Sequence, residues 1–480
     1  MRRARAALAV AAALALGACG SGGEPDRAAT GGSTLDATLR DPDGDGALAP
    51  ADGEPLRLPD GGAAGEPAER LARLAQITDA HVRDEESPAR VPFLDRFGAP
   101  LSSTFRPQEA LTLQVLAATV DAVNAAEPDA VIQTGDLADN AQRNELVQAM
   151  TVLRGGRANP DSGAPGVDPH APQRASNPDP FLYRPAVDAP RHPDLLAAAQ
   201  RPFAAPGLDA PLHSVLGNHD VLVQGELVPD ARTQALAVGD RAVVELDPAL
   251  VESVDPPAPD ADGEGGVGPI SVDTVAQVLG TGRTAAAPPD ADRRQVTVDE
   301  ARQITGAQAV EAFDVGPLRA LALDLNRPEG GSGGRVTPEA LAWLEAELER
   351  AGDRPVIVVT HQPLDTAEGG EAALAALAAR PSVLAAIAGH THRNEVRRGP
   401  GGVWLVTTAS LADFPSQARM FELVRLGDGR LALDTWMVDH GAGPAGLAAT
   451  ARELAFLDAQ GGRPSGFAGT AADRNVRLIR

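Results

Sequence analysis

The sequence predicts an α/β fold built from layers of strands and helices. Short apolar runs typical of buried strands alternate along the chain with segments whose apolar residues recur at helical spacing. The 480-residue chain is 43% hydrophobic, which is enough for a sizeable core. Because only 3% of the residues are aromatic, we expect Ala, Val and Leu to form most of that core.

The predicted elements follow one another from residue 71 onward. Strands are expected at residues 71–78, 130–134, 212–216, 318–325, 356–360, 383–388, 403–407, 420–426 and 431–438. Helices are expected at residues 107–126, 139–153 and 337–350. Pro107 lies in the first turn of the first helix, Asp139 is a candidate N-cap of the second, and Thr337 caps the third ahead of a proline.

The composition excludes several classes of function. The formal net charge is −24, and such a surface repels nucleic-acid phosphates, so no nucleic-acid partner is expected. All 42 basic residues are arginine, so the chain has no P-loop lysine and no lysine that could form a Schiff base. Cys19 is the single cysteine, which excludes a disulfide within the chain and a thiolate zinc cluster.

The beginning of the sequence predicts export and a lipid anchor. Three arginines among the first five residues precede an apolar run at residues 6–16, as in a signal peptide (1–18) that is too short to span a bilayer. Residues 16–19 read Leu-Gly-Ala-Cys, which resembles a bacterial lipobox with Cys19 as the lipidated residue. We therefore expect a lipoprotein at the outer face of a bacterial cytoplasmic membrane or in the cell envelope. The alternative is an ordinary signal peptide with an incidental cysteine.

The rest of the chain divides by composition. Residues 19–68 are rich in Gly, Pro, Asp and Ala without periodicity, which predicts a flexible tether that spans roughly 40 Å as a coil. Residues 69–440 are expected to form one domain with long loop insertions at about 155–211 and 229–289. Residues 441–480 are expected to form a C-terminal tail that is partly helical.

Five polar segments each follow a predicted strand at its carboxyl end, the edge at which ligands of α/β sheets gather. They read Asp79-Ala80-His81, Gly135-Asp136-Leu137-Ala138-Asp139-Asn140, Gly217-Asn218-His219-Asp220, Thr360-His361-Gln362-Pro363 and Gly389-His390-Thr391-His392. Their carboxylate, imidazole and amide groups, without thiolate, suit Mn, Fe or Zn. Residues two apart in an extended chain point to the same side, so we expect each of the pairs Asp79/His81 and His390/His392 to hold one ion.

These motifs, in this order, resemble those of the calcineurin-like metallophosphoesterases: D-x-H, G-D-x-x-D, G-N-H-D/E, a lone H and G-H-x-H. The resemblance spans residues 71–440 apart from the two insertions. It implies a four-layer α/β/β/α sandwich with two divalent metal ions (Mn, Fe or Zn) between its two sheets. The metal-binding tyrosine of purple acid phosphatases has no counterpart here, since the single tyrosine, Tyr183, lies in an insertion.

The resemblance also implies a role for each motif residue. One metal would be held by Asp79, His81, Asp136 and His392. The other would be held by Asp136, Asn218, His361 and His390, with Asp136 bridging the two ions. His219 would be the catalytic histidine, oriented by Asp220; the alternative for Asp220 is a helix N-cap. Asp139 and Asn140 either support the surroundings of Asp136 or cap the following helix, and the cap is the preferred interpretation.

The expected reaction is hydrolysis of a phosphate mono- or diester. Two cations lower the pKa of a bridging water toward neutral, and the resulting hydroxide attacks phosphorus while His219 protonates the departing oxygen. Two alternatives stay open. One is a non-catalytic metal- or solute-binding lipoprotein, and the other is a serine hydrolase, because residues 330–334 fit the G-x-S-x-G pattern.

Overall fold

The computed structural model of the chain describes residues 31–61, 64–90, 92, 105–163, 172–178, 182–245, 282–460 and 466–480. The predicted signal peptide, Cys19 and much of the second predicted insertion lie outside these residues.

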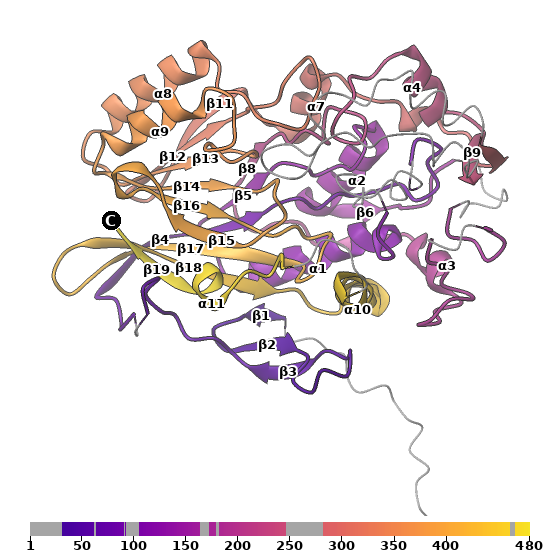
Figure 1. Cartoon of the computed structure of the whole chain (residues 1–480), viewed down its shortest axis with the longest axis horizontal. Coiled ribbons are helices and arrows are strands. Elements are labelled where there is room, and N and C mark those ends of the chain that lie inside the picture. The colour runs from indigo at the N-terminus through magenta and orange to yellow at the C-terminus, as the bar shows by residue number, and fades with distance from the viewer. Residues whose placement is uncertain are drawn as a thin grey trace, which may run out of the picture.

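Two β-sheets lie face to face at the centre of the fold (Figure 1). The first sheet has the strand order β1-β18-β17-β4-β5-β8, with β19 also paired to β18. Its strands are β1 (Gly32–Ser33), β4 (Glu69–Ile77), β5 (Ala130–Thr134), β8 (Leu212–Val215), β17 (Gln417–Arg425), β18 (Leu431–Asp439) and β19 (Val476–Ile479). The second sheet has the order β11-β12-β13-β14-β16-β15. Its strands are β11 (Val310–Val315), β12 (Leu318–Leu323), β13 (Val356–Val359), β14 (Val383–Ala388), β15 (Glu395–Arg398) and β16 (Trp404–Thr407).

Helices cover the outer face of each sheet. The core between the sheets joins residues such as Ile132 and Phe421 of the first to Ile357 and Ile387 of the second. On the far side of the first sheet pack α1 (Thr112–Ala125), α2 (Arg143–Arg154) and α10 (Leu447–Gln460). On the far side of the second pack α8 (Pro338–Ala351) and α9 (Gly370–Ala378). The predicted four-layer α/β/β/α sandwich is therefore confirmed.

Shorter elements lie around these layers. They are the helices α3 (Leu195–Ala199), α4 (Ala231–Ala237), α7 (Val298–Thr305) and α11 (Ala471–Arg474), and the two-stranded pairs β2 (Ala37–Arg40) with β3 (Ala49–Asp52), β6 (Gly156–Ala158) with β7 (Phe203–Ala205), and β9 (Arg241–Glu245) with β10 (Arg283–Ala286). Some of them fall within the two predicted insertions, which are therefore partly structured over their described residues.

Helix starts follow the sequence in one case and not in two others. α1 begins at Thr112, after a short 3₁₀ turn at Glu109–Leu111, so the placement of Pro107 in its first turn is wrong. α8 begins at Pro338 as predicted, and the Thr337 side chain accepts a hydrogen bond from the backbone N–H of Ala340. α2 begins at Arg143 rather than at residue 139, and its N-cap Gln142 makes no side-chain cap. The prediction of Asp139 as an N-cap is wrong because its carboxylate is held by a histidine and an arginine.

The strand directions bring the predicted motifs to common edges. β4, β5 and β8 run parallel to one another, as do β12, β13, β14 and β16. The carboxyl ends of parallel neighbours meet at the same edge of a sheet, which is where each motif begins.

The N-terminal stretch differs from the predicted tether over its described part. β1 pairs with β18, and the Thr34 hydroxyl donates to the Met437 carbonyl over 2.9 Å. β2 and β3 form a hairpin beside it, and Glu54 makes ion pairs with Arg40 and Arg474. These contacts use backbone groups and ion pairs, so apolar periodicity could not reveal them.

The C-terminal tail adds a strand to the first sheet. β19 pairs with residues 432–435 of β18, while β1 pairs with residues 438–439 of the same strand. The two end regions of the described chain therefore share one sheet edge (Figure 1).

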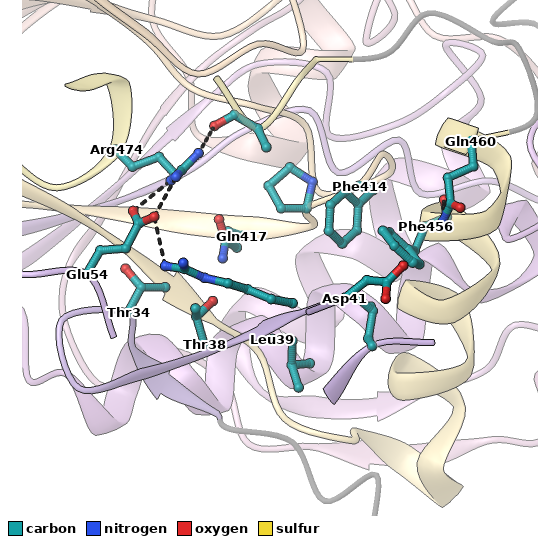
Figure 2. Close-up of a pocket in the computed structure, with 14 residues that line it drawn as sticks. Thr34, Thr38, Leu39, Asp41, Glu54, Phe414, Gln417, Phe456, Gln460 and Arg474 are labelled. Carbon is teal, nitrogen blue, oxygen red and sulfur yellow. Dashed lines mark hydrogen bonds and ion pairs between the residues drawn. The ribbon is translucent and has the colours of Figure 1, made fainter. Parts of the chain in front are cut away.

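A pocket of about 460 Å³ lies between these two end regions. Figure 2 shows Glu54 and Arg474 at one end and the aromatic pair Phe414 and Phe456 at the other. The predicted metal ligands do not line it. Within the described residues, no helix combines the length and the apolar character that crossing a membrane requires.

Candidate metal centre

The structure brings the predicted motif residues together although they span residues 79–392. The motifs follow β4, β5 and β8 of the first sheet and β13 and β14 of the second. All seven predicted ligands are buried, with exposed fractions of 2% or less. Their donor atoms form two adjoining groups, which we call the Asp79 cluster (Asp79, His81 and His392) and the Asp136 cluster (Asp136, His361 and His390).

The Asp79 cluster has two imidazole nitrogens and a carboxylate facing one another. The Nε2 atoms of His81 and His392 are 3.1 Å apart, and His392 Nε2 lies 3.4 Å from Asp79 Oδ1. Each imidazole has its Nδ1 beside another carboxylate, at 3.2 Å from Asp139 for His81 and 2.6 Å from Asp413 for His392. With Nδ1 donating to those carboxylates, two Nε2 lone pairs face each other, an arrangement that a cation between them satisfies.

The amide of Asn218, the third predicted type of donor, lies beside the Asp136 cluster. His361 Nε2 lies 3.1 Å from Asp136 Oδ2 and 3.0 Å from Asn218 Oδ1. Asp136 Oδ2 is also 3.8 Å from His81 Nε2, so this one carboxylate reaches both clusters. The donor chemistry therefore fits two transition-metal ions that share Asp136, and the grouping matches the division that the resemblance implied. Metal binding by these residues stays a prediction.

The expected pairing of His390 with His392 on one ion is wrong. His390 belongs to the Asp136 cluster and His392 to the Asp79 cluster. The argument assumed an extended chain, but φ is +68° at His390 and +54° at His392. Asp79 and His81 do share a cluster, although they are also left-handed, with φ of +50° and +41°.

Positive φ values at five predicted ligands indicate backbone strain at this site. Asp136 has φ of +50° as well, and such conformations persist in non-glycine residues only where surrounding structure holds them. Two glycines let the loops approach each other closely, because a side chain at either position would clash with a carboxylate. A Cβ on Gly217 would lie 2.1 Å from Asp136 Oδ1, and one on Gly389 would lie 2.4 Å from Asp79 Oδ2. The glycine in each of these motifs is therefore a steric requirement.

Electrostatics within the clusters follow from burial and proximity. Burial alone would lower the pKa of His361, but the carboxylates of Asp136 and Asp79 and the hydrogen bond to the Thr134 carbonyl together raise it to about 9. Burial would raise the pKa of Asp136, and the surrounding imidazoles His361, His219 and His81 instead hold it well below its ordinary value.

His219 lies at the edge of both clusters. Its backbone N–H donates to Asp136 Oδ1 over 2.8 Å, and its Nδ1 donates to the Asp139 carbonyl over 2.6 Å. Its ring centroid is 4.6 Å from that of His81. Burial lowers the pKa of His219 to about 4, so the free side chain is neutral near pH 7.

Asp220 does not orient His219 as predicted, and no helix begins after it for it to cap. Its carboxylate accepts three backbone N–H groups over 2.8 Å, those of Gly217, Leu137 and Ala138. It therefore joins the loop after β5 to the loop after β8. Burial, with the neighbouring Asp136 charge, raises the pKa of Asp220 to about 7.

Three buried residues beside the ligands, Arg83, Arg106 and Asp413, carry no signal in the sequence. For Asp139 the sequence leaves two interpretations, support for the surroundings of Asp136 or a helix cap, and its contacts with His81 and Arg83 exclude the cap. Arg83 contacts Asp139, and Arg106 contacts Asp413. Asp413 lies in a loop before β17 with no motif around it.

The serine-hydrolase alternative does not fit the structure. Ser332 is 3% exposed and lies in a loop between β12 and α8, with no helix until Pro338. A nucleophile elbow requires the serine at a sharp turn from strand to helix, with its hydroxyl exposed.

Tyr183 is not a metal ligand in this structure. Its hydroxyl donates a hydrogen bond to the Pro190 carbonyl.

Comparison with known proteins gives a family match. The model of the calcineurin-like phosphoesterase family matches residues 72–394. No curated protein matches the chain.

The chain is also similar to several solved structures, of which three follow. A dimetal phosphatase from Danio rerio is 15% identical, with a TM-score of 0.39, and the match covers 77% of this chain and 96% of that one. GAP50 of Plasmodium is 11% identical, with a TM-score of 0.31 and coverages of 84% and 98%. Purple acid phosphatase PPD1 from yellow lupin is 12% identical, with a TM-score of 0.31 and coverages of 79% and 55%.

Proposed function

Since the chain belongs to the calcineurin-like phosphoesterase family, whose members are metal-dependent phosphoesterases, we propose that it hydrolyses a phosphate mono- or diester at two divalent cations. The observation that carries the proposal is the shared carboxylate. Asp136 Oδ2 lies within 3.8 Å of an imidazole nitrogen from each cluster, as a bridging ligand requires. Asp79, His81 and His392 would hold one ion, and Asn218, His361 and His390 would complete the other.

When bound, the two cations would clamp the phosphate oxygens and supply a nucleophile from water near neutral pH. The chain itself supplies the proton that the departing alkoxide needs. His219 donates its Nδ1 proton to the Asp139 carbonyl, so its Nε2 is an acceptor in the neutral imidazole. A bound phosphate ester is negatively charged and favours the imidazolium, whose Nε2 proton then passes to the departing oxygen.

The test is metal analysis of the purified chain together with rates on chromogenic phosphate esters. We expect two equivalents of Mn, Fe or Zn and turnover of 4-nitrophenyl phosphate or bis(4-nitrophenyl) phosphate that a chelator abolishes. Metal at two equivalents without turnover of either ester would instead support the metal- or solute-binding alternative. The ratio of the two rates decides between monoesterase and diesterase activity.

We also propose that the protein is exported and anchored through lipid on Cys19. Support comes from the order of charged, apolar and small residues that precede the single cysteine. In a bacterial host, the full chain should partition into the membrane fraction and incorporate labelled fatty acid. The variant Cys19→Ala should do neither; labelling that survives this change contradicts the proposal.

A further inference from the structure

The two histidines of the Asp79 cluster differ from His361 of the Asp136 cluster in the group that lies beside Nδ1. In the Asp79 cluster, both imidazoles have a carboxylate at Nδ1, and each carboxylate is in turn held by an arginine. In the Asp136 cluster, His361 Nδ1 donates over 2.8 Å to the backbone carbonyl of Thr134. A carboxylate acceptor is charged and a carbonyl acceptor is neutral, so the hydrogen bonds that fix the rings of the Asp79 cluster are the charge-assisted ones.

The arrangement behind His392 is closed and buried. Asp413 Oδ2 accepts from His392 Nδ1 over 2.6 Å. Arg106 donates from Nε to Asp413 Oδ1 over 2.6 Å and from Nη2 to Oδ2 over 3.2 Å. The Arg106 and Asp413 side chains are only 7% and 8% exposed. The guanidinium thus fixes the carboxylate plane, and the carboxylate fixes the ring and leaves Nε2 for the cluster.

A parallel arrangement stands behind His81. Asp139 Oδ1 lies 3.2 Å from His81 Nδ1 and 2.5 Å from Arg83 Nη2. Glu109 connects the two arrangements, because its Oε1 lies 2.6 Å from Arg83 Nη1 and accepts the Arg106 backbone N–H over 2.7 Å. Both histidines of the Asp79 cluster are therefore held by one continuous network of ion pairs and hydrogen bonds.

We propose that Asp413 and Arg106 are positioning residues that make the Asp79 cluster the tighter of the two cation sites. This inference rests on the proposed function. Asp413 lies outside the residues 72–394 that match the family model, so the match does not account for it. Removal of such a carboxylate behind a ligating histidine costs roughly 10- to 100-fold in metal affinity.

The experiment titrates the metal-free full chain with Mn²⁺ by calorimetry, for the wild type and for Asp413→Asn. The wild type should bind two equivalents of unequal affinity. Asparagine keeps the shape but lacks the charge, so the variant should bind the tighter equivalent about 10- to 100-fold more weakly. The weaker equivalent should change by less than about threefold.

The matched control is Asp434→Asn. Asp434 also pairs with a buried arginine, Arg477, at 2.6 Å, but this pair joins β18 to β19 and contacts no histidine. The control removes a comparable buried ion pair and should leave both affinities unchanged. An equal loss in the control would show that the effect of Asp413→Asn is structural and would overturn the inference.

A second variant covers the case in which Asp413→Asn does not fold, as judged by circular dichroism. Asn218→Ala removes a predicted donor of the Asp136 cluster, so it should abolish the weaker equivalent and keep the tighter one. Loss of the tighter equivalent in this variant, or an unchanged tighter equivalent in Asp413→Asn, would refute the inference while the proposed function stands. A wild type that binds none of Mn²⁺, Fe²⁺ and Zn²⁺ would instead refute the proposed function.

Discussion

The loop after β4 and the loop after β14 carry pairs of ligands with the same spacing but use them differently. Asp79 and His81 face one cluster, whereas His390 and His392 face two. All four residues have left-handed backbone. A hydrogen bond joins the loop after β14 to the loop after β4: the His390 backbone N–H donates to the Asp79 carboxylate over 3.1 Å. The comparison teaches that a two-residue spacing identifies ligands but does not say which of them share an ion.

The largest effect is expected where the two clusters meet, at Asp136. In Asp136→Ala both cations lose a ligand, so we expect neither to be retained and phosphatase activity to fall below detection. Elemental analysis and an ester assay measure this. Asp209→Ala, at an exposed aspartate, is the control and should keep both metals. A variant at residue 136 that still holds two equivalents would remove the bridging role.

The next effect separates the two histidines of the second loop. His390→Ala and His392→Ala should each retain about one equivalent of metal, from opposite clusters, and the double variant should retain none. The control is Thr391→Ala, which changes the residue between them. If either single variant lost both ions while Thr391→Ala lost none, the two clusters would not be independent sites.

A smaller effect is expected at His219, which touches both clusters without belonging to the predicted ligands. His219→Gln should keep two equivalents of metal and lower kcat about 10²- to 10⁴-fold, since proton transfer typically contributes that much. His213→Gln is the matched control, because His213 lies on β8 and pairs with Glu311 at the surface. Normal turnover in His219→Gln would exclude His219 as the proton donor.

The smallest effect on chemistry, and a clear effect on stability, is expected at Asp220. Asp220→Asn presents amide hydrogens to at least one of three backbone donors, so the free energy of unfolding should fall by about 1–3 kcal/mol. Urea unfolding measures this. A catalytic orienting role predicts the opposite pattern, namely unchanged stability with a fall in kcat as large as that of His219→Gln.

Much of the fold could be predicted because its signals are local. Strands buried on both faces appear as continuous apolar runs, such as residues 356–359 and 383–388. The start of α8 is predicted by two adjacent residues, Thr337 and Pro338. The predicted site residues came together for the same reason, since each follows such a strand.

The rest could not be predicted because it depends on contacts between distant residues. Asp413 meets Arg106 and His392 only after the chain has folded, and no neighbouring residue marks it. Asp220 was misassigned because adjacency in sequence suggested His219, while its three hydrogen-bond donors come from residues 137, 138 and 217. The N-terminal hairpin is held by backbone hydrogen bonds and ion pairs. Its sequence therefore has no periodic pattern of apolar residues that could predict it.

With the proposed lipid anchor on Cys19, the pairing of β1 with β18 would limit how far the folded domain can stand from a membrane. The chain is already docked at Gly32, whose register partner is Asp439. Between a lipid on Cys19 and this point there are about 13 peptide units, which reach at most roughly 45 Å. An undocked stretch up to residue 68 would reach roughly 175 Å. A linker this short would confine hydrolysis to phosphate esters that lie close to the lipid headgroups.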